Sequence, residues 1–204
     1  MFPGKMKVVF LDVDGVLNTL ESLGGGEEGE NIIIDNKSGS SLELRCLQNL
    51  TNILLKTGAK IVVTSTWRLF PDMLEFLTRT VNDMYRHSLA WNNSEKGETE
   101  INEKSVIIGS TIDGGPPPFG RGRGMEVRVW LESHPDCDRF VVLDDDHKQS
   151  FQDNLFGDKQ LPSGVKGMLV ETKLGGLLDD LPFSDQGLTE KHVETVIDFL
   201  NKDT

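Results

Sequence analysis

Short apolar runs alternate with amphipathic segments along the chain. Five runs rich in β-branched residues lie at 7–11, 60–64, 106–109, 140–143 and 167–170. Nearly continuous apolar runs of this length are typical of strands that are buried on both faces of a sheet. Because strands that alternate with helices usually form a parallel sheet with helices on both faces, the pattern predicts an α/β fold.

Apolar residues at helical spacing mark four helices between and after these runs. The first follows a capping-box pattern, Ser40-x-x-Glu43, and should end at Gly58. Pro71 fits the first turn of the second helix, and Thr189 can cap the last one. The apolar faces are predicted to contain Leu47, Leu50, Ile53 and Leu54, then Leu74, Leu77 and Val81, then Val127, Trp130 and Leu131, and finally Val193, Val196, Ile197 and Leu200.

Two segments interrupt this alternation. The segment 16–40 has a glycine-rich, acidic centre that separates 16–20 from 31–35, and we expect these ends to pair as a flap hairpin with an acidic tip. The segment 109–124, the last part of a break in the alternation that begins at about Tyr85, is rich in glycine and proline and should form a loop. Neither is long enough to bury a core of its own, so the sequence predicts a single domain over 1–204.

The charge and the targeting signals restrict the partners. A formal net charge of −12 opposes general attraction to a nucleic-acid backbone, although four arginines are close in sequence. No apolar stretch approaches the roughly 18 residues needed to cross a bilayer, and the first residues lack the features of a signal peptide. We therefore expect no membrane partner and a cytoplasmic or nuclear location. The four arginines are Arg121, Arg123, Arg128 and Arg139.

Polar residues follow three of the predicted strands. The first strand ends in DVDG at 12–15, the second in TST at 64–66 and the fourth in DDD at 144–146. In open parallel sheets, ligands bind in the crevice outside the carboxyl ends of the strands. Each motif alone is common in turns and helix caps. Their joint occurrence at strand ends indicates one site.

The DVDG motif suggests a bound cation. If the extended conformation persists to Asp14, the period of two points the carboxylates of Asp12 and Asp14 the same way while Val13 enters the core. Gly15 then allows a sharp turn. A divalent ion would relieve the repulsion between the two charges, and hard oxygen ligands favour Mg²⁺. The hydroxyls and N–H groups at 64–66 are suited to phosphate.

Taken together, these motifs resemble those of the haloacid dehalogenase (HAD) superfamily, whose hhhhDxDGV motif matches VVFLDVDGV. The resemblance implies a doubly wound, Rossmann-like sheet with strand order 3-2-1-4-5 and at most a minimal cap. It implies that Asp12 is the nucleophile and Asp14 the general acid and base, which binds Mg²⁺ through its backbone carbonyl. Thr64 and the N–H of Ser65 would contact the phosphate.

The resemblance extends to the later motifs. The basic clamp on the phosphate would be Arg123, with Arg121 as the alternative, because both lie in RGRG. The LDDD segment would complete a magnesium site of Asp12, Asp14, Asp144 and Asp145, with Asp145 favoured as the direct ligand. More narrowly, DVDGVLN, TSTWR, RGxE, LDDD and GLTE resemble small HAD-like domains of RNA-repair multidomain proteins over about residues 7–200.

The function implied is magnesium-dependent hydrolysis of a phosphomonoester through an aspartyl phosphate. Because both cap insertion sites are short, we expect an open site that admits a DNA or RNA end. The alternatives are a phosphatase of free nucleotides or other small metabolites, and a non-catalytic phosphate-binding module. Trp67 could stack on a base and Arg68 could grip a second phosphate. Otherwise Trp67 packs beneath the sheet edge and Arg68 pairs with an acid.

Two other interpretations of the acidic motifs fit the sequence less well. A calcium-binding EF-hand loop needs a liganding oxygen at its fifth position and glycine at its sixth, whereas here glycine is fourth and Val16 is fifth. A phosphoacceptor receiver domain places its acceptor aspartate after a middle strand, where this chain has Thr64. Neither pattern accounts for the motifs as a set.

Overall fold

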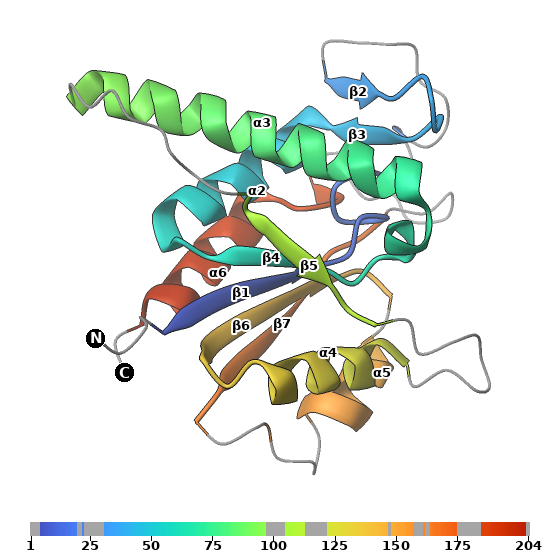
Figure 1. Ribbon diagram of the computed structural model, residues 1–204, viewed down its shortest axis with the longest axis vertical. Coiled ribbons are helices and arrows are strands. Elements are labelled where there is room, and N and C mark those ends of the chain that lie inside the picture. Colours follow the sequence, from blue (N-terminus) through green and yellow to red (C-terminus); the bar gives the residue numbers. More distant parts are fainter. Residues whose placement is uncertain are drawn as a thin grey trace.

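Five strands form the central sheet of the protein in the computed structural model (Figure 1). They are β1 (Met6–Leu11), β4 (Lys60–Val63), β5 (Ile107–Ser110), β6 (Cys137–Asp144) and β7 (Lys166–Glu171). Their order is β5-β4-β1-β6-β7, and all neighbouring pairs are parallel. Counted along the chain as the five predicted runs, this is the order 3-2-1-4-5, so the predicted sheet is confirmed.

The structure describes residues 5–19, 22, 31–96, 105–112, 122–146, 148–156, 161, 164–174 and 185–202. The glycine-rich centre of the predicted flap and most of the predicted 109–124 loop lie outside these residues, and so does Arg121.

Helices cover both faces of the sheet (Figure 1). One face carries α2 (Leu44–Thr57), α3 (Pro71–Lys96) and α6 (Glu190–Asn201). The other carries α4 (Gly122–Ser133), α5 (Lys148–Phe151) and the π-helical turn η2 (Gln152–Phe156). The alternation along β1 serves both layers, since Val9 and Leu11 belong to the core under α2, α3 and α6, whereas Val8 and Phe10 belong to the core under α4.

The four predicted helices are present, but α2 begins later than expected. Ser41–Glu43 form strand β3, which pairs antiparallel with β2 (Ile32–Ile34). The predicted capping box is therefore wrong, because Glu43 is buried and accepts a hydrogen bond from the Thr19 hydroxyl at 3.0 Å. Gly58 does end the helix, with a left-handed φ of 67° and its N–H on the Leu54 carbonyl.

The hairpin after β1 also differs from the prediction. The expected pairing of 16–20 with 31–35 is replaced by the β2–β3 pair, and residues 14–17 form a turn directly after the first strand. The turn is fixed by hydrogen bonds from the N–H groups of Val16 and Leu17 to the Val13 carbonyl. Because Val16 and Leu17 are bonded within this turn, they are not part of a strand.

Both cysteines are interior residues. Cys46 lies on the buried face of α2, Cys137 begins β6, and both are free and buried. Burial raises the pKa of Cys46 to about 11 and that of Cys137 to about 12. Both therefore stay as neutral thiols at physiological pH, as the sequence suggested.

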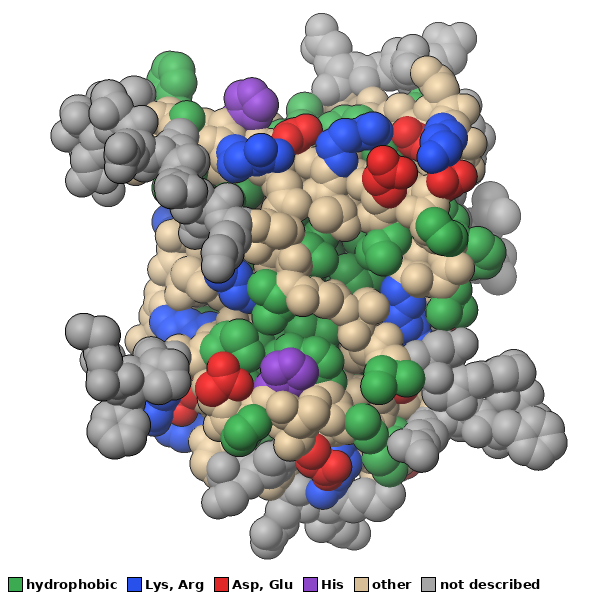
Figure 2. Space-filling view, in the orientation of Figure 1, with side chains coloured by type: hydrophobic (Ala, Val, Ile, Leu, Met, Phe, Trp, Pro, Cys, Tyr) green, Lys and Arg blue, Asp and Glu red, His purple; other side chains and the backbone are tan. Residues whose placement is uncertain are grey.

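Charged side chains of both signs share the surface over α3. Figure 2 shows Lys and Arg interspersed with Asp and Glu along this helix. Lys37 pairs with Asp72 at 2.8 Å, and Arg86 pairs with Asp83 at 2.7 Å. The described part of this face therefore offers no continuous basic stripe for a nucleic-acid backbone. Among the described helices, none has both the length and the apolar character needed to cross a bilayer.

Candidate active site

The DVDG segment leads from β1 into a turn at the carboxyl edge of the sheet. The Asp12 N–H donates to the Leu143 carbonyl at 3.0 Å, which fixes Asp12 between β1 and β6. Val13 is fully buried, as the period of two predicts. Gly15 has a φ of 73°, and a Cβ there would lie 2.2 Å from Asp145 Oδ2. Only glycine fits this turn, because both the backbone conformation and the neighbouring carboxylate exclude a side chain.

Three carboxylates converge beside this turn. Asp12, Asp144 and Asp145 each offer an oxygen, and these oxygens lie within 4.8 Å of one another. Burial and the two neighbouring carboxylates raise the pKa of Asp145 to about 6. Burial also raises the pKa of Asp12; Arg123 opposes this effect, whereas Asp144 adds to it. A cation bound among these carboxylates would reduce the repulsion between their negative charges.

The cluster fits a divalent metal ion. Within the described residues, Asp12 Oδ1 is buried and has no hydrogen-bond partner, so it is open to a ligand. Carboxylate oxygens are the donors that Mg²⁺ prefers. The Asp14 carboxyl is not a member of the cluster. The Asp14 side chain is therefore not needed as a ligand in this cluster.

Arg123 approaches the same carboxylates from the first turn of α4. Its Nη1 lies 2.6 Å from Asp12 Oδ2 and 2.8 Å from Asp144 Oδ2. The other described arginines of the sequence cluster lie elsewhere. Arg128 pairs with a glutamate on its own helix, and Arg139 is buried near the amino end of β6. Closeness in sequence therefore did not predict a basic patch in space.

A buried hydroxyl lies at the site, directly after β4. Thr64 is fully buried, and its Oγ1 has no partner among the described residues. The N–H groups of Thr64 and Ser65 donate to the Leu11 carbonyl at 2.8 and 3.3 Å. The Ser65 N–H, expected at the phosphate, is thus already engaged with β1, whereas the Thr64 hydroxyl is available.

Arg68 lies beneath the site. One guanidinium nitrogen contacts the carbonyls of Thr64 and Ser65, and the other pairs with Glu126 at 2.9 Å. The same Glu126 oxygen accepts the Thr111 hydroxyl at 3.1 Å. Both charged side chains are largely buried. Of the two roles that the sequence left open for Arg68, pairing with an acid is the one this geometry displays. The network joins the ends of β4 and β5 to α4, one turn beyond Arg123.

Trp67 is buried as well. It follows the strand end in the single-turn helix η1 (Thr66–Leu69), is 3% exposed, and stacks on Phe76 with ring centroids 6.4 Å apart. A base could stack on this ring only if the ring left its packing. Its indole N–H points instead to Asp14 Oδ1 at 3.3 Å.

Two contacts of the turn escaped the sequence reasoning. The Asn18 amide donates to Asp14 Oδ1 at 2.9 Å, and the Thr172 hydroxyl donates to the Gly15 carbonyl at 2.8 Å. Asn18 is part of the DVDGVLN segment, so its position three residues after the glycine was a usable signal. Thr172 follows β7 and carries no local signal.

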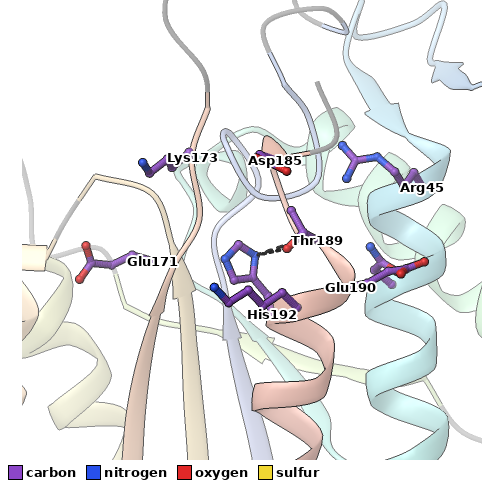
Figure 3. Close-up of a pocket in the computed structure, with 9 residues that line it drawn as sticks. Arg45, Glu171, Lys173, Asp185, Thr189, Glu190 and His192 are labelled. Atoms are coloured by element: carbon purple, nitrogen blue, oxygen red, sulfur yellow. Dashed lines mark hydrogen bonds between the residues drawn. The ribbon is translucent and has the colours of Figure 1, made fainter. Parts of the chain in front are cut away.

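A separate cleft of about 610 Å³ lies on the same edge of the sheet, between α2, the end of β7 and the start of α6 (Figure 3). Its lining contains as many acidic residues as lysines and arginines, and it does not include Asp12, Thr64 or Arg123. A balanced lining gives no preference for an anion. The charged residues of the lining are Arg45, Lys173, Lys191, Glu171, Asp185 and Glu190.

A parallel sheet that gathers an acidic cluster at the carboxyl ends of β1 and β6, with a hydroxyl at the end of β4, defines a HAD-like protein. Comparison with protein-family models matches residues 8–173 to the family described as "HAD domain in Swiss Army Knife RNA repair proteins", and the chain belongs to this family. The resemblance found in the sequence is confirmed. Searches of curated proteins and of solved structures found no match.

Proposed function

We propose that the protein is a magnesium-dependent phosphomonoester hydrolase that works through an aspartyl phosphate on Asp12. The observation that carries the proposal is the convergence of Asp12, Asp144 and Asp145, in which a buried oxygen of Asp12 has no hydrogen-bond partner among the residues that the structure describes. Membership of a HAD family supports it, since HAD phosphatases generally use Mg²⁺. The general test is phosphate release that depends on Mg²⁺ and on Asp12.

The first half-reaction forms the covalent intermediate. An Asp12 oxygen attacks phosphorus in line with the leaving oxygen, and the bond between phosphorus and that oxygen breaks. Asp14, whose carboxyl lies outside the metal cluster, gives a proton to the departing oxygen. The Thr64 hydroxyl, which is buried and unpartnered within the described part of the chain, donates to a phosphoryl oxygen.

The second half-reaction releases phosphate. Asp14 accepts a proton from a water molecule, the water oxygen bonds to phosphorus, and Asp12 leaves as a carboxylate. When bound by Asp12, Asp144, Asp145 and the Asp14 carbonyl, Mg²⁺ would neutralise phosphoryl charge. Arg123 adds a second positive charge from the α4 side, where it already contacts two of these carboxylates.

Arg123→Ala is expected to lower kcat by about a hundredfold or more, which is about 2.7 kcal/mol of transition-state stabilisation. The physical reason is that its guanidinium nitrogen lies 2.6 Å from an oxygen of Asp12. Steady-state kinetics would measure the loss. Arg128→Ala is the matched control on the same helix and should leave kcat nearly unchanged. If Arg121→Ala is the slower enzyme by kcat, the clamp must be reassigned to Arg121.

The favoured substrate is the phosphorylated end of a DNA or RNA strand. The family description refers to RNA repair. Exposed apolar side chains near the carboxyl edge of the sheet also suit an organic leaving group. Phe70, which directly follows η1, is 54% exposed, and Ile112, which lies after β5, is 75% exposed. With Trp67 buried, Phe70 replaces it as the aromatic candidate for contact with a terminal base.

Comparison of substrate classes tests this assignment. We expect kcat/KM on 3′- or 5′-phosphorylated oligonucleotides to exceed that on mononucleotides and sugar phosphates at fixed, moderate salt. Phe70→Ala should raise KM for oligonucleotides and leave hydrolysis of a small aryl phosphate near the wild-type rate. A preference of about a hundredfold for a small metabolite, or about 2.7 kcal/mol, would favour the alternative of a metabolite phosphatase. The acidic net charge is the observation that keeps this alternative open.

A further inference from the structure

The carboxyl group of Asp14 is held at one of its two oxygens. Oδ1 accepts a hydrogen bond from the Asn18 amide at 2.9 Å and another from the Trp67 indole N–H at 3.3 Å. Within the described residues, the hydrogen bonds to this carboxyl all end on Oδ1. The two oxygens of the same group therefore lie in different environments.

The direction of both hydrogen bonds follows from the chemistry of the donors. An indole N–H can only donate. The Asn18 amide could in principle be turned either way, but its Oδ1 accepts the backbone N–H of Gly15 at 3.0 Å. A backbone N–H cannot accept, so the amide NH₂ must face Asp14. Oδ1 of Asp14 meets two donors and acts only as an acceptor.

Both donors are themselves fixed in the protein interior. Asn18 is fully buried, and Trp67 is 3% exposed. The Trp67 ring stacks on Phe76, and the backbone N–H of Trp67 donates to the Ser65 hydroxyl at 3.3 Å. Side chains locked by packing hold a catalytic group within the narrow geometry that proton transfer requires.

We propose that Trp67 and Asn18 are positioning residues that reserve Oδ1 of Asp14 as an acceptor and leave Oδ2 to carry the transferred proton. This rests on the hydrolase function proposed above. In a neutral carboxyl group the carbonyl oxygen is the better acceptor, so two donors at Oδ1 select the form with its O–H at Oδ2.

The proton then moves through Oδ2 in both half-reactions. In the first, the Oδ2 hydroxyl gives its proton to the leaving oxygen, which keeps the electron pair of the broken bond to phosphorus. In the second, Oδ2 takes a proton from water while the water oxygen bonds to phosphorus and Asp12 regains its carboxylate. Asp14 ends the cycle protonated at the oxygen from which it began.

The test compares leaving groups that differ in their need for a proton. Trp67→Phe removes the indole N–H and keeps an aromatic ring in the core. The ratio kcat/KM reports the steps up to formation of the phosphorylated Asp12, where only the leaving group needs a proton. For the best alkyl phosphate substrate we expect kcat/KM to fall about tenfold or more, and for p-nitrophenyl phosphate, whose leaving group departs as a stable anion, to change less than about threefold.

Two further variants sharpen the comparison. Asn18→Asp keeps the side-chain size and the acceptor for the Gly15 N–H, but it places an oxygen where Asp14 needs a donor. It should show the same selectivity between the two substrates with a larger loss on the alkyl phosphate. Trp130→Phe changes a buried tryptophan in the core on the other face of the sheet and should leave both kcat/KM values near wild type.

Equal losses on both substrates would show that Trp67 acts through packing alone, and the proposal would be wrong. It would also be wrong if Trp67→Phe lost activity on neither substrate. If Trp67→Phe does not fold, a benzothienyl analogue of tryptophan at position 67 removes only the N–H, and the same selectivity is expected. A wild-type protein without phosphatase activity on either substrate would overturn the hydrolase function and this proposal together. Wild-type activity with an unselective variant overturns this proposal alone.

Discussion

Asp12→Asn is expected to abolish turnover and leave the fold intact. An amide fills nearly the same volume as the carboxylate, and its oxygen can still accept from Arg123, which lies 2.6 Å from Asp12. It cannot form an acyl phosphate, so kcat should fall by about 10⁴-fold or more. Phosphate release by purified protein measures the loss, and circular dichroism with thermal unfolding checks the fold.

The matched control is Asp153→Asn, an exposed aspartate of η2 that lies outside the carboxylate cluster. It should retain the wild-type kcat. Asp14→Asn should also be severely impaired, but by a different route, because it keeps the nucleophile and can accumulate phosphorylated enzyme with an activated aryl phosphate. Substantial activity of Asp12→Asn protein in a contaminant-free preparation would mean that another group attacks phosphorus.

Removal of divalent metal should have a comparably large effect. Excess chelator is expected to lower activity at least about a hundredfold, and Mg²⁺ should restore it, because three buried or half-buried carboxylates then regain a counter-charge. Ca²⁺ should support little turnover, since its larger and looser coordination shell would misplace the attacking oxygen. Beryllium fluoride, which mimics a phosphoryl group on a carboxylate, should inhibit.

Thermal unfolding provides a readout of the metal that does not depend on catalysis. Mg²⁺ should raise the Tm of the wild-type protein, because it binds the folded state. The shift should shrink in Asp145→Asn and persist in Asp153→Asn. Turnover that survives excess chelator, together with a Tm that ignores Mg²⁺, would be incompatible with a metal site at these carboxylates.

The sequence was sufficient to predict the sheet and the approach of distant motifs. Apolar runs gave the five strands, and the rule that ligands bind at the carboxyl ends of parallel strands brought Asp12, Thr64 and Asp144 to one edge. Both features depend on short-range patterns that repeat along the chain, which is why they could be read without coordinates. The helix that begins at Pro71 followed from the same periodicity, but its extension to Lys96 was not predicted, because a break in the alternation was expected from about Tyr85.

Contacts set by tertiary packing were not predictable in the same way. Ser40-x-x-Glu43 satisfies a capping box, yet Glu43 is buried and bonded to Thr19 and Arg45. The aromatic and basic residues of TSTWR were consistent either with contacts to a base and a phosphate or with packing and an ion pair, and the fold packs Trp67 against Phe76. Nothing in a local pattern distinguishes an exposed tryptophan beside a site from a buried one beneath it.

The contact between the turn after β1 and the last acidic motif restricts how the chain can evolve. A Cβ at Gly15 would lie 2.2 Å from Asp145 Oδ2, although the two residues are far apart in the sequence. A larger residue at position 15 would have to displace the carboxylate, and a φ of 73° would remain unfavourable for it. Positions 15 and 145 therefore cannot change independently in evolution. A descendant that acquires a side chain at position 15 loses the carboxylate geometry of Asp145. Selection to retain Gly15 or Asp145 would then be lost as well.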